Sequence, residues 1–229
     1  MDTLNQMGMV QIRPLLLSIL AGFPPAEVKK SLRLFVSWAV RFLVVGGLGG
    51  GGTLGSHYAQ RAKEVTDGTI KNTSQLQKTK KDIIPADARF EAEFAVATVS
   101  KPILARYYLM ALERQARGES QPEFIPNPNE EQVNLEHILP QNPSTAWGHI
   151  DAESAKAAHK RLGNMALLKA RINVAAANKG FAEKRKIYLA SEFLLTKEVA
   201  KAASWLPTDI ESRQKELAKM AVAAWPNKV

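Results

Sequence analysis

An acid and a histidine stand side by side near the middle of the chain, at the end of a short apolar segment. The sequence there reads V-N-L-E-H-I-L-P-Q, with Glu136 and His137 as the pair. Asn164 and Asn173 follow, nine residues apart. A histidine can accept a proton near neutral pH, and carboxylate and amide oxygens are ligands that a hard divalent cation prefers. Such a set could activate a water and neutralise the charge on a phosphate, as phosphodiester hydrolysis requires.

Further motifs surround these residues in a recognisable order. They read E-H-I-L-P-Q, L-G-N-M-A-L-L and F-A-E-K, followed by the late tryptophans Trp205 and Trp225. In this order they resemble the HNH (His-Me finger) nucleases, and more narrowly the C-terminal nuclease domain of the GmrSD-type, modification-dependent restriction endonucleases. The resemblance covers about the last hundred residues well and the first part of the chain only loosely. It implies a hairpin and a helix around one divalent ion, and DNA hydrolysis that leaves a 5′-phosphate and a 3′-hydroxyl.

The resemblance assigns a role to each candidate residue. His137 would be the general base, and Asn173, at the last motif position, would be both a catalytic residue and a metal ligand. Asn164 would belong to the same catalytic set, mainly by tying the loop together with hydrogen bonds. Glu136 would be the second metal ligand. Asn178 is an alternative to Asn173, which the nine-residue spacing favours. An amide oxygen suits Mg²⁺, or Mn²⁺, better than zinc, so one of these ions is the expected cofactor.

Two geometric requirements follow from this assignment. Neighbouring side chains of a regular strand point to opposite faces, so a twist or bulge must bring the Glu136 carboxylate to the metal. The ring of His137 must be held in one tautomer, which a backbone carbonyl across the hairpin could do.

Basic residues surround the motifs. The formal net charge of the chain is +9, and the segment 160–186 alone carries eight basic residues and one acid, or +7. Such a balance favours a polyanion as partner, because Lys and Arg contacts to phosphate dominate nucleic-acid affinity. A solvated helix face is the alternative interpretation. The residues predicted to contact DNA phosphates are Lys160, Arg161, Lys169, Arg171, Lys179, Lys184 and Arg185.

Composition excludes several kinds of chemistry. The chain has no cysteine, which rules out disulfides, iron–sulfur clusters, Cys-ligated zinc and a Cys nucleophile. The lack of cysteine and of a signal-peptide pattern is typical of a cytoplasmic protein. The most apolar stretch, 32–50, contains Arg33 and Arg41 and ends in a glycine-rich run. We therefore interpret it as a buried helix and expect no membrane span.

The remaining histidines and tryptophans are expected to be structural. His57, His149 and His159 have no second ligand at helix or hairpin spacing, so we interpret them as surface or packing residues. The tryptophans expected to pack the small C-terminal domain are Trp147, Trp205 and Trp225.

A change of composition divides the chain. Residues 118–132 carry three prolines and no apolar periodicity, which predicts a linker. Residues 1–117 are expected to form a helical domain without a catalytic constellation, and residues 133–229 an HNH domain. The predicted class is mainly α with a small α+β (ββα-metal) nuclease domain. Its expected elements are strands near 133–138 and 165–168, and helices near 152–162, 181–195 and 208–225, the last opened by a T-x-x-E capping box.

The main hypothesis is a divalent-metal-dependent DNA endonuclease, a nickase or a double-strand cutter, that acts in defence against foreign or modified DNA. Whole proteins of the resembled type carry an N-terminal nucleotide-hydrolysing domain with a D-G-Q-Q-R-like motif. This sequence has neither that motif nor a Walker sequence. We therefore expect a fragment or a subunit, with DNA and a nucleotide-hydrolysing domain or subunit as partners. The alternative is a catalytically inactive DNA-binding or regulatory subunit that acts with such a partner.

Overall fold

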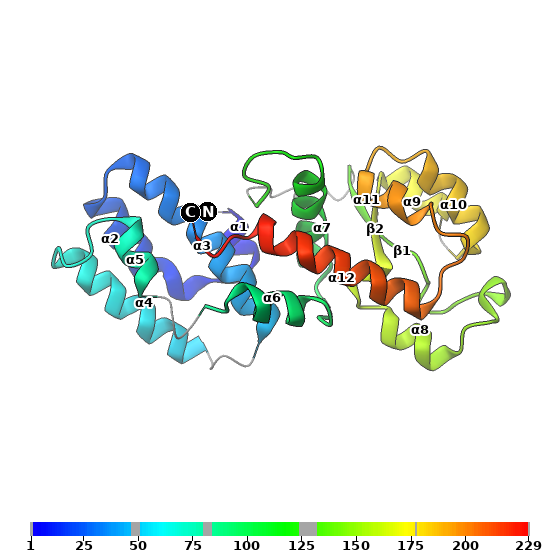
Figure 1. Ribbon diagram of the computed structural model, residues 1–229, viewed down its shortest axis with the longest axis horizontal. Coiled ribbons are helices and arrows are strands. Elements are labelled where there is room, and N and C mark those ends of the chain that lie inside the picture. The colour runs from blue at the N-terminus through cyan, green and yellow to red at the C-terminus, as the bar shows by residue number, and fades with distance from the viewer. Residues whose placement is uncertain (1, 47–50, 80–83, 124–131, 177, 229) are drawn as a thin grey trace. The chain divides into compact units, whose positions relative to one another are not determined.

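Helices make up most of the chain in the computed structural model, which describes all residues except 1, 47–50, 80–83, 124–131, 177 and 229 (Figure 1). The contacts divide the chain into two units, residues 1–93 with 225–229, and residues 94–224. The predicted class, mainly α with a small α+β part, is confirmed. No helix among the described residues is long and apolar enough to cross a membrane.

The first unit is helical. Its elements are α1 (Asp2–Gln6), η1 (Val10–Ile12), α2 (Arg13–Gly22), α3 (Pro25–Val45), α4 (Gly51–Thr66), α5 (Thr73–Lys78) and most of α6 (Asp87–Phe94). Helix α3 is the buried helix predicted from the apolar stretch, whose last residues, 47–50, lie outside the described residues. Its Arg41 is fully buried and donates to the carbonyls of Trp225 and Pro85 and to the carboxylate of Asp87. Trp225 therefore packs in this unit, not in the nuclease-like domain as predicted.

The second unit contains a two-stranded antiparallel sheet among helices. The sheet pairs β1 (Asn134–His137) with β2 (Met165–Leu168), with Asn134 opposite Leu168 and His137 opposite Met165. The other elements are α7 (Pro102–Ala116), η2 (Thr145–Trp147), α8 (Ala152–Ala158), η3 (Leu162–Asn164), α9 (Ala170–Ala176), α10 (Phe181–Leu189), α11 (Leu194–Val199) and α12 (Pro207–Ala224). Trp147 and Trp205 are buried in its core, as predicted.

The second unit begins earlier than the boundary predicted at 118–132. It starts at Phe94 and includes α7, and the described part of the predicted linker lies inside it. The physical reason is a set of contacts that local composition does not reveal. The side chain of Gln214, fully buried on α12, donates to the carbonyls of Phe94 and Ala97 at 2.9 and 2.8 Å, and its Oε1 accepts from the backbone N–H of Gly163.

Gly163 allows α12 to approach the start of β2. A Cβ atom at this position would lie 2.2 Å from the carbonyl oxygen of Ile210. No side chain fits there, which explains the glycine of the L-G-N motif physically. The guanidinium of Arg213 then donates to the carbonyls of Gly163 and Met165 at 2.8 and 2.7 Å. Helix α12 thus holds the turn that leads into β2.

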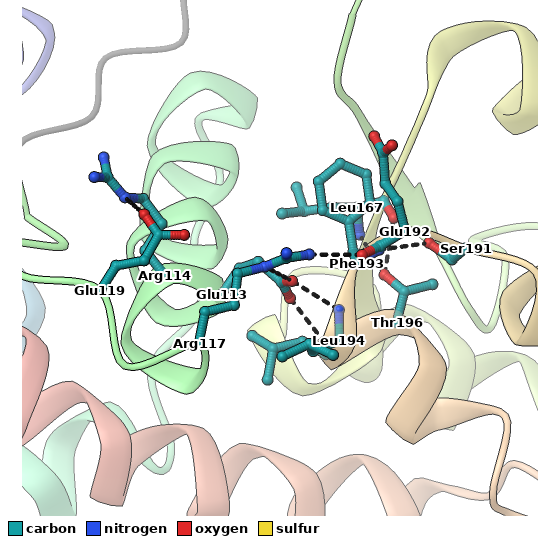
Figure 2. Close-up of polar contacts among 11 residues, drawn as sticks. Glu113, Arg114, Arg117, Glu119, Leu167, Ser191, Glu192, Phe193, Leu194 and Thr196 are labelled. Carbon is teal, nitrogen blue, oxygen red and sulfur yellow. Dashed lines mark hydrogen bonds and ion pairs between the residues drawn. The ribbon is translucent and has the colours of Figure 1, made fainter.

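Helix α7 is tied to β2 through α11. The buried carboxylate of Glu113 accepts hydrogen bonds from the backbone N–H groups of Leu194 and Leu195 at 2.7 and 2.8 Å (Figure 2). These N–H groups have no helical partner at the start of α11. The hydroxyl of the next residue, Thr196, donates to the carbonyl of Leu167, in the middle of β2. The predicted helix 181–195 therefore ends at Leu189, because Glu113 starts a new helix at Leu194.

The last helix begins one residue before the predicted capping box. Helix α12 starts at Pro207. The carboxylate of Asp209, and not the side chain of the predicted Thr208-Glu211 pair, accepts a bond from the N–H of Leu206 at 2.8 Å. The predicted helix 152–162 also ends early, at Ala158, because the carbonyl of Lys160 accepts from the N–H of Val99.

Replacing Glu113 by alanine should destabilise the second unit. The change leaves two backbone donors of α11 without an acceptor, and each such loss costs about 1–3 kcal/mol. Urea unfolding followed by tryptophan fluorescence measures the free energy. Glu119→Ala is the matched control, because Glu119 pairs with Arg114 as Glu113 pairs with Arg117, but is 42% exposed. The control should change the free energy of unfolding by about 0–1 kcal/mol. Equal effects of the two substitutions would contradict this role of Glu113.

Candidate active site

The end of β1 is pinned by the side chain of Asn164, which is fully buried. Its Oδ1 accepts from the N–H of Leu139 at 2.8 Å, and its Nδ2 donates to the carbonyl of Leu139 at 2.9 Å. Its own carbonyl accepts from the N–H of Ile138. Asn164 therefore fixes the two residues that follow His137, which is the loop-tying geometry expected of it.

Glu136 points into a buried polar cluster. Its Oε1 accepts from Lys184 Nζ at 2.6 Å and from the hydroxyl of Tyr188 at 3.0 Å. We call these three residues the buried triad. Lys184 and Tyr188 stand one turn apart on α10, so both side chains reach the same side of that helix. Burial raises the pKa of Glu136, and the positive charge of Lys184 opposes that rise.

The predicted twist or bulge beside Glu136 is not found. Glu136 pairs with Ala166 and His137 with Met165 in regular antiparallel register. Side chains of a regular strand alternate, so the structure leaves Glu136 on the face opposite His137. β1 is thus regular through His137, without the distortion that was expected to bring the Glu136 carboxylate to the metal.

Lys184 was predicted to contact a DNA phosphate, and this prediction is wrong. Its side chain has no exposed surface. Besides its bond to Glu136, its Nζ donates to the backbone carbonyl of His137 at 2.7 Å. Lys184 therefore fixes the backbone of the candidate base. The signal was present in the sequence, because Phe181, Lys184 and Tyr188 recur at the spacing of one helix face.

His137 is half-buried at the end of β1, and its ring stacks on that of His159. The ring centroids are 4.1 Å apart and the planes differ by 15°. The predicted carbonyl that would hold the tautomer is not found among the described residues. Burial lowers the pKa of His137 to about 4, helped by charge repulsion from Lys184 and from His159 in its protonated form. The ring is therefore neutral at neutral pH and can accept a proton.

His159 is a residue that sequence reasoning missed. It was interpreted as a surface or packing histidine, yet it lies against the candidate base. The register of the hairpin could have indicated this position. Since Met165 pairs with His137, the residues that lead into β2 must return to the end of β1.

Asn173, on α9, carries an unusual free acceptor. Its Nδ2 donates to the carbonyl of Leu135, two residues before His137, at 3.2 Å. Its Oδ1 is buried and has no hydrogen-bond partner in the described part of the chain. The alternative, Asn178, is exposed, and its carbonyl accepts from the hydroxyl of Ser144. A buried acceptor without a partner is costly, so the Asn173 oxygen is suited to a ligand.

The described residues around His137 offer few ligands for a metal ion. No group of three or more His, Cys, Asp and Glu side chains that could hold a metal exists among the described residues. Asn173 Oδ1 is a free oxygen, whereas the Glu136 carboxylate is bonded to Lys184 and Tyr188. Mg²⁺ is the ion that so few protein ligands would suit, because it keeps several waters.

The basic residues differ in what they can contact. Arg161 is half-buried and donates to Gln214 and to the carbonyl of Ala95, so it is less available to a phosphate than the exposed basic residues. Lys169 pairs with Glu192 at the surface, and Arg185 donates to the carbonyl of Ala200. The residues of the predicted set whose side chains are exposed are Lys160, Lys169, Arg171, Lys179 and Arg185.

Comparison with known proteins defines the family. Residues 84–220 match the family described as GmrSD restriction endonucleases, C-terminal domain. Since the match spans more than half of the sequence, the chain belongs to this family. The resemblance drawn from the motifs is thereby confirmed, and the second unit is a domain of restriction-endonuclease type. No curated protein matches the chain.

Removing the Lys184 ammonium should strongly destabilise the protein. Lys184→Met leaves the Glu136 carboxylate buried without its cation, and breaking a buried pair in this way costs about 3–5 kcal/mol. The pKa of Glu136 then lies further above its unfolded value, so the folded state binds more protons. The stability of the variant should therefore rise as pH falls through that pKa. Urea unfolding at several pH values measures this.

Two further variants complete the test. Lys186→Met is the matched control, because Lys186 is an exposed lysine on the same helix. The double variant Glu136→Gln with Lys184→Met should recover part of the lost stability, because no buried charge remains. A Lys184→Met protein as stable as the Lys186→Met protein would show that the buried triad does not support the fold.

Proposed function

We propose that this chain is an HNH-type, divalent-metal-dependent DNA endonuclease with His137 as its general base. The observation that supports this most is the position of His137. It lies half-buried at the end of β1, Lys184 holds its backbone carbonyl, and Asn164 holds the two residues that follow it. Burial lowers its pKa, so the ring can accept a proton at neutral pH. A base needs both a free nitrogen lone pair and a fixed position.

The reaction would be hydrolysis of a phosphodiester. His137 takes a proton from a water as the water oxygen attacks phosphorus, the bond from phosphorus to the 3′ oxygen breaks, and the leaving 3′ oxygen takes a proton from solvent. The products are a 5′-phosphate and a 3′-hydroxyl. A bound Mg²⁺ or Mn²⁺ supplies charge neutralisation at the phosphate and at the leaving oxygen. Asn173, through its free Oδ1, is the residue that would hold this ion. The Glu136 carboxylate, predicted as the second ligand, is bonded to Lys184 and Tyr188.

DNA binding would use the exposed basic residues. Phosphate contacts require side chains that reach solvent, and the charge of such residues makes affinity fall with salt. The contacts we propose are therefore made by Lys160, Lys169, Arg171, Lys179 and Arg185. A role in defence against foreign or modified DNA, in the cytoplasm and beside a nucleotide-hydrolysing domain or subunit, completes the proposal.

The buried triad supports a second candidate function. Both hydrogen bonds of the Glu136 carboxylate are made within the protein, and a histidine of pKa about 4 is a weak base. Both features are compatible with a catalytically inactive DNA-binding or regulatory subunit. Metal-dependent cleavage distinguishes the two candidates.

Replacing His137 by alanine should abolish cleavage of supercoiled plasmid while folding and DNA binding persist. Loss of a general base typically lowers the rate about 10²–10⁴-fold. Because the base must be unprotonated and its pKa is lowered to about 4, kcat/KM of the native protein should stay flat below neutral pH. It should fall only as pH approaches that pKa. Plasmid relaxation measured from neutral to acid pH tests both expectations, and wild-type cutting by His137→Ala would refute the proposal.

The metal requirement should depend on Asn173 more than on Asn178. Few protein ligands imply weak binding, so activity should need Mg²⁺ or Mn²⁺ in roughly the millimolar range. Asn173→Ala should raise the metal concentration for half-maximal cleavage, whereas Asn178→Ala, at an exposed position, should not. Cleavage that persists in excess chelator, or a tightly held zinc found by elemental analysis, would contradict this expectation.

A further inference from the structure

His159 lies face to face with the proposed base. The ring centroids of His137 and His159 are 4.1 Å apart, with 15° between the planes. No hydrogen bond to either ring is found in the part of the chain that the structure describes. The stack is therefore the contact that restricts the plane of the His137 ring, because rotation of that ring would drive its edge into the face of its neighbour.

The chain that directly follows His159 is anchored by backbone and side-chain contacts. The carbonyl of Lys160 accepts from the N–H of Val99 at 2.8 Å, and Arg161 pairs with Thr98 across an isolated β-bridge. Arg161 is further held by Gln214 of α12. Because this backbone is held in place, the His159 ring cannot follow movements of the His137 ring. The His159 ring can therefore limit the rotation of the His137 ring.

The polar atoms of His159 do not explain its position. Its Nδ1 is buried without a hydrogen-bond partner among the described residues. Burial lowers the pKa of His159, and the charge of Lys160 lowers it further. The ring is therefore neutral at neutral pH, and two neutral rings can stack without charge repulsion.

We propose that His159 is a positioning residue whose flat face holds the His137 imidazole in the orientation that accepts the proton of the attacking water. This inference rests on the proposed function, and His159 acts through His137 without touching substrate. A misplacement of a reacting group by about 1 Å can cost roughly 10²-fold in rate. Loss of the His159 ring should therefore lower kcat and leave KM and DNA affinity unchanged.

Three substitutions separate the flat face from the polar atom. His159→Phe keeps a flat ring and removes both nitrogens. His159→Asn keeps a polar atom near the position of Nδ1 and removes the ring, and His159→Ala removes both. His149→Ala is the matched control, because His149 is also stacked on an aromatic ring, that of Trp147, with 6.3 Å between centroids.

Plasmid cleavage at saturating DNA and Mg²⁺ gives kcat for each full-length variant. We expect His159→Ala and His159→Asn to lose about 10-fold or more in kcat, within the range known for misplaced groups. His159→Phe should retain most of the wild-type kcat, and His149→Ala all of it. Melting temperatures and gel-shift affinities of the four variants should match those of the native protein. A His159→Ala protein with native kcat, or a His159→Phe protein as impaired as His159→Ala, would overturn the inference.

A second measurement does not depend on cleavage. The chain has only four histidines, so each ring signal can be assigned by substitution in a ¹³C-histidine NMR spectrum. The His137 ring signal should shift and broaden in His159→Ala and stay sharp in His159→Phe. An unchanged signal in His159→Ala would overturn the inference even if the native protein cut no DNA. Failure of the proposed function itself is recognised separately, by an inactive native protein or an active His137→Ala variant.

Discussion

The site depends on one buried ammonium group. Lys184 Nζ donates at 2.6 Å to the Glu136 carboxylate and at 2.7 Å to the carbonyl of His137. A lysine without exposed surface is costly unless its charge is paired and its protons are bonded. This pairing fixes α10 against the last two residues of β1. The candidate base thus gains its position from a charge that was expected to contact DNA.

Further contacts connect the hairpin that holds His137 to the helices around it. Asn164 and Arg213 hold the turn that leads into β2, and Gly163 lets α12 approach it. Thr196 bonds β2 from α11, whose first N–H groups are capped by Glu113 of α7. Helix α7 and residues 94–99 are therefore part of the nuclease-type unit. The family match, which begins at residue 84, covers both.

The sequence predicted the mainly helical class, the two strands and the position of Asn164, because motif residues in one hairpin are separated by short, regular spacings. It failed where the outcome depended on burial or on distant partners. A count of charges cannot distinguish exposed Lys186 from buried Lys184, two residues away. The early start of the unit depends on Gln214, more than a hundred residues after the carbonyls of Phe94 and Ala97 that it binds. The contact of His159 with His137 was not predicted, because metal ligands have a characteristic spacing in the sequence and ring stacking has no such spacing.

The central claim is that this fold hydrolyses DNA with water activated at His137. The most direct test is cleavage in ¹⁸O-labelled water with Mg²⁺, followed by mass spectrometry and end-group analysis of the products. If His137 activates the water, each new 5′-phosphate should carry one labelled oxygen, the 3′ ends should be free hydroxyls, and His137→Ala should give neither product. Products that carry a 3′-phosphate, or labelled 5′-phosphates formed equally by His137→Ala, would contradict it.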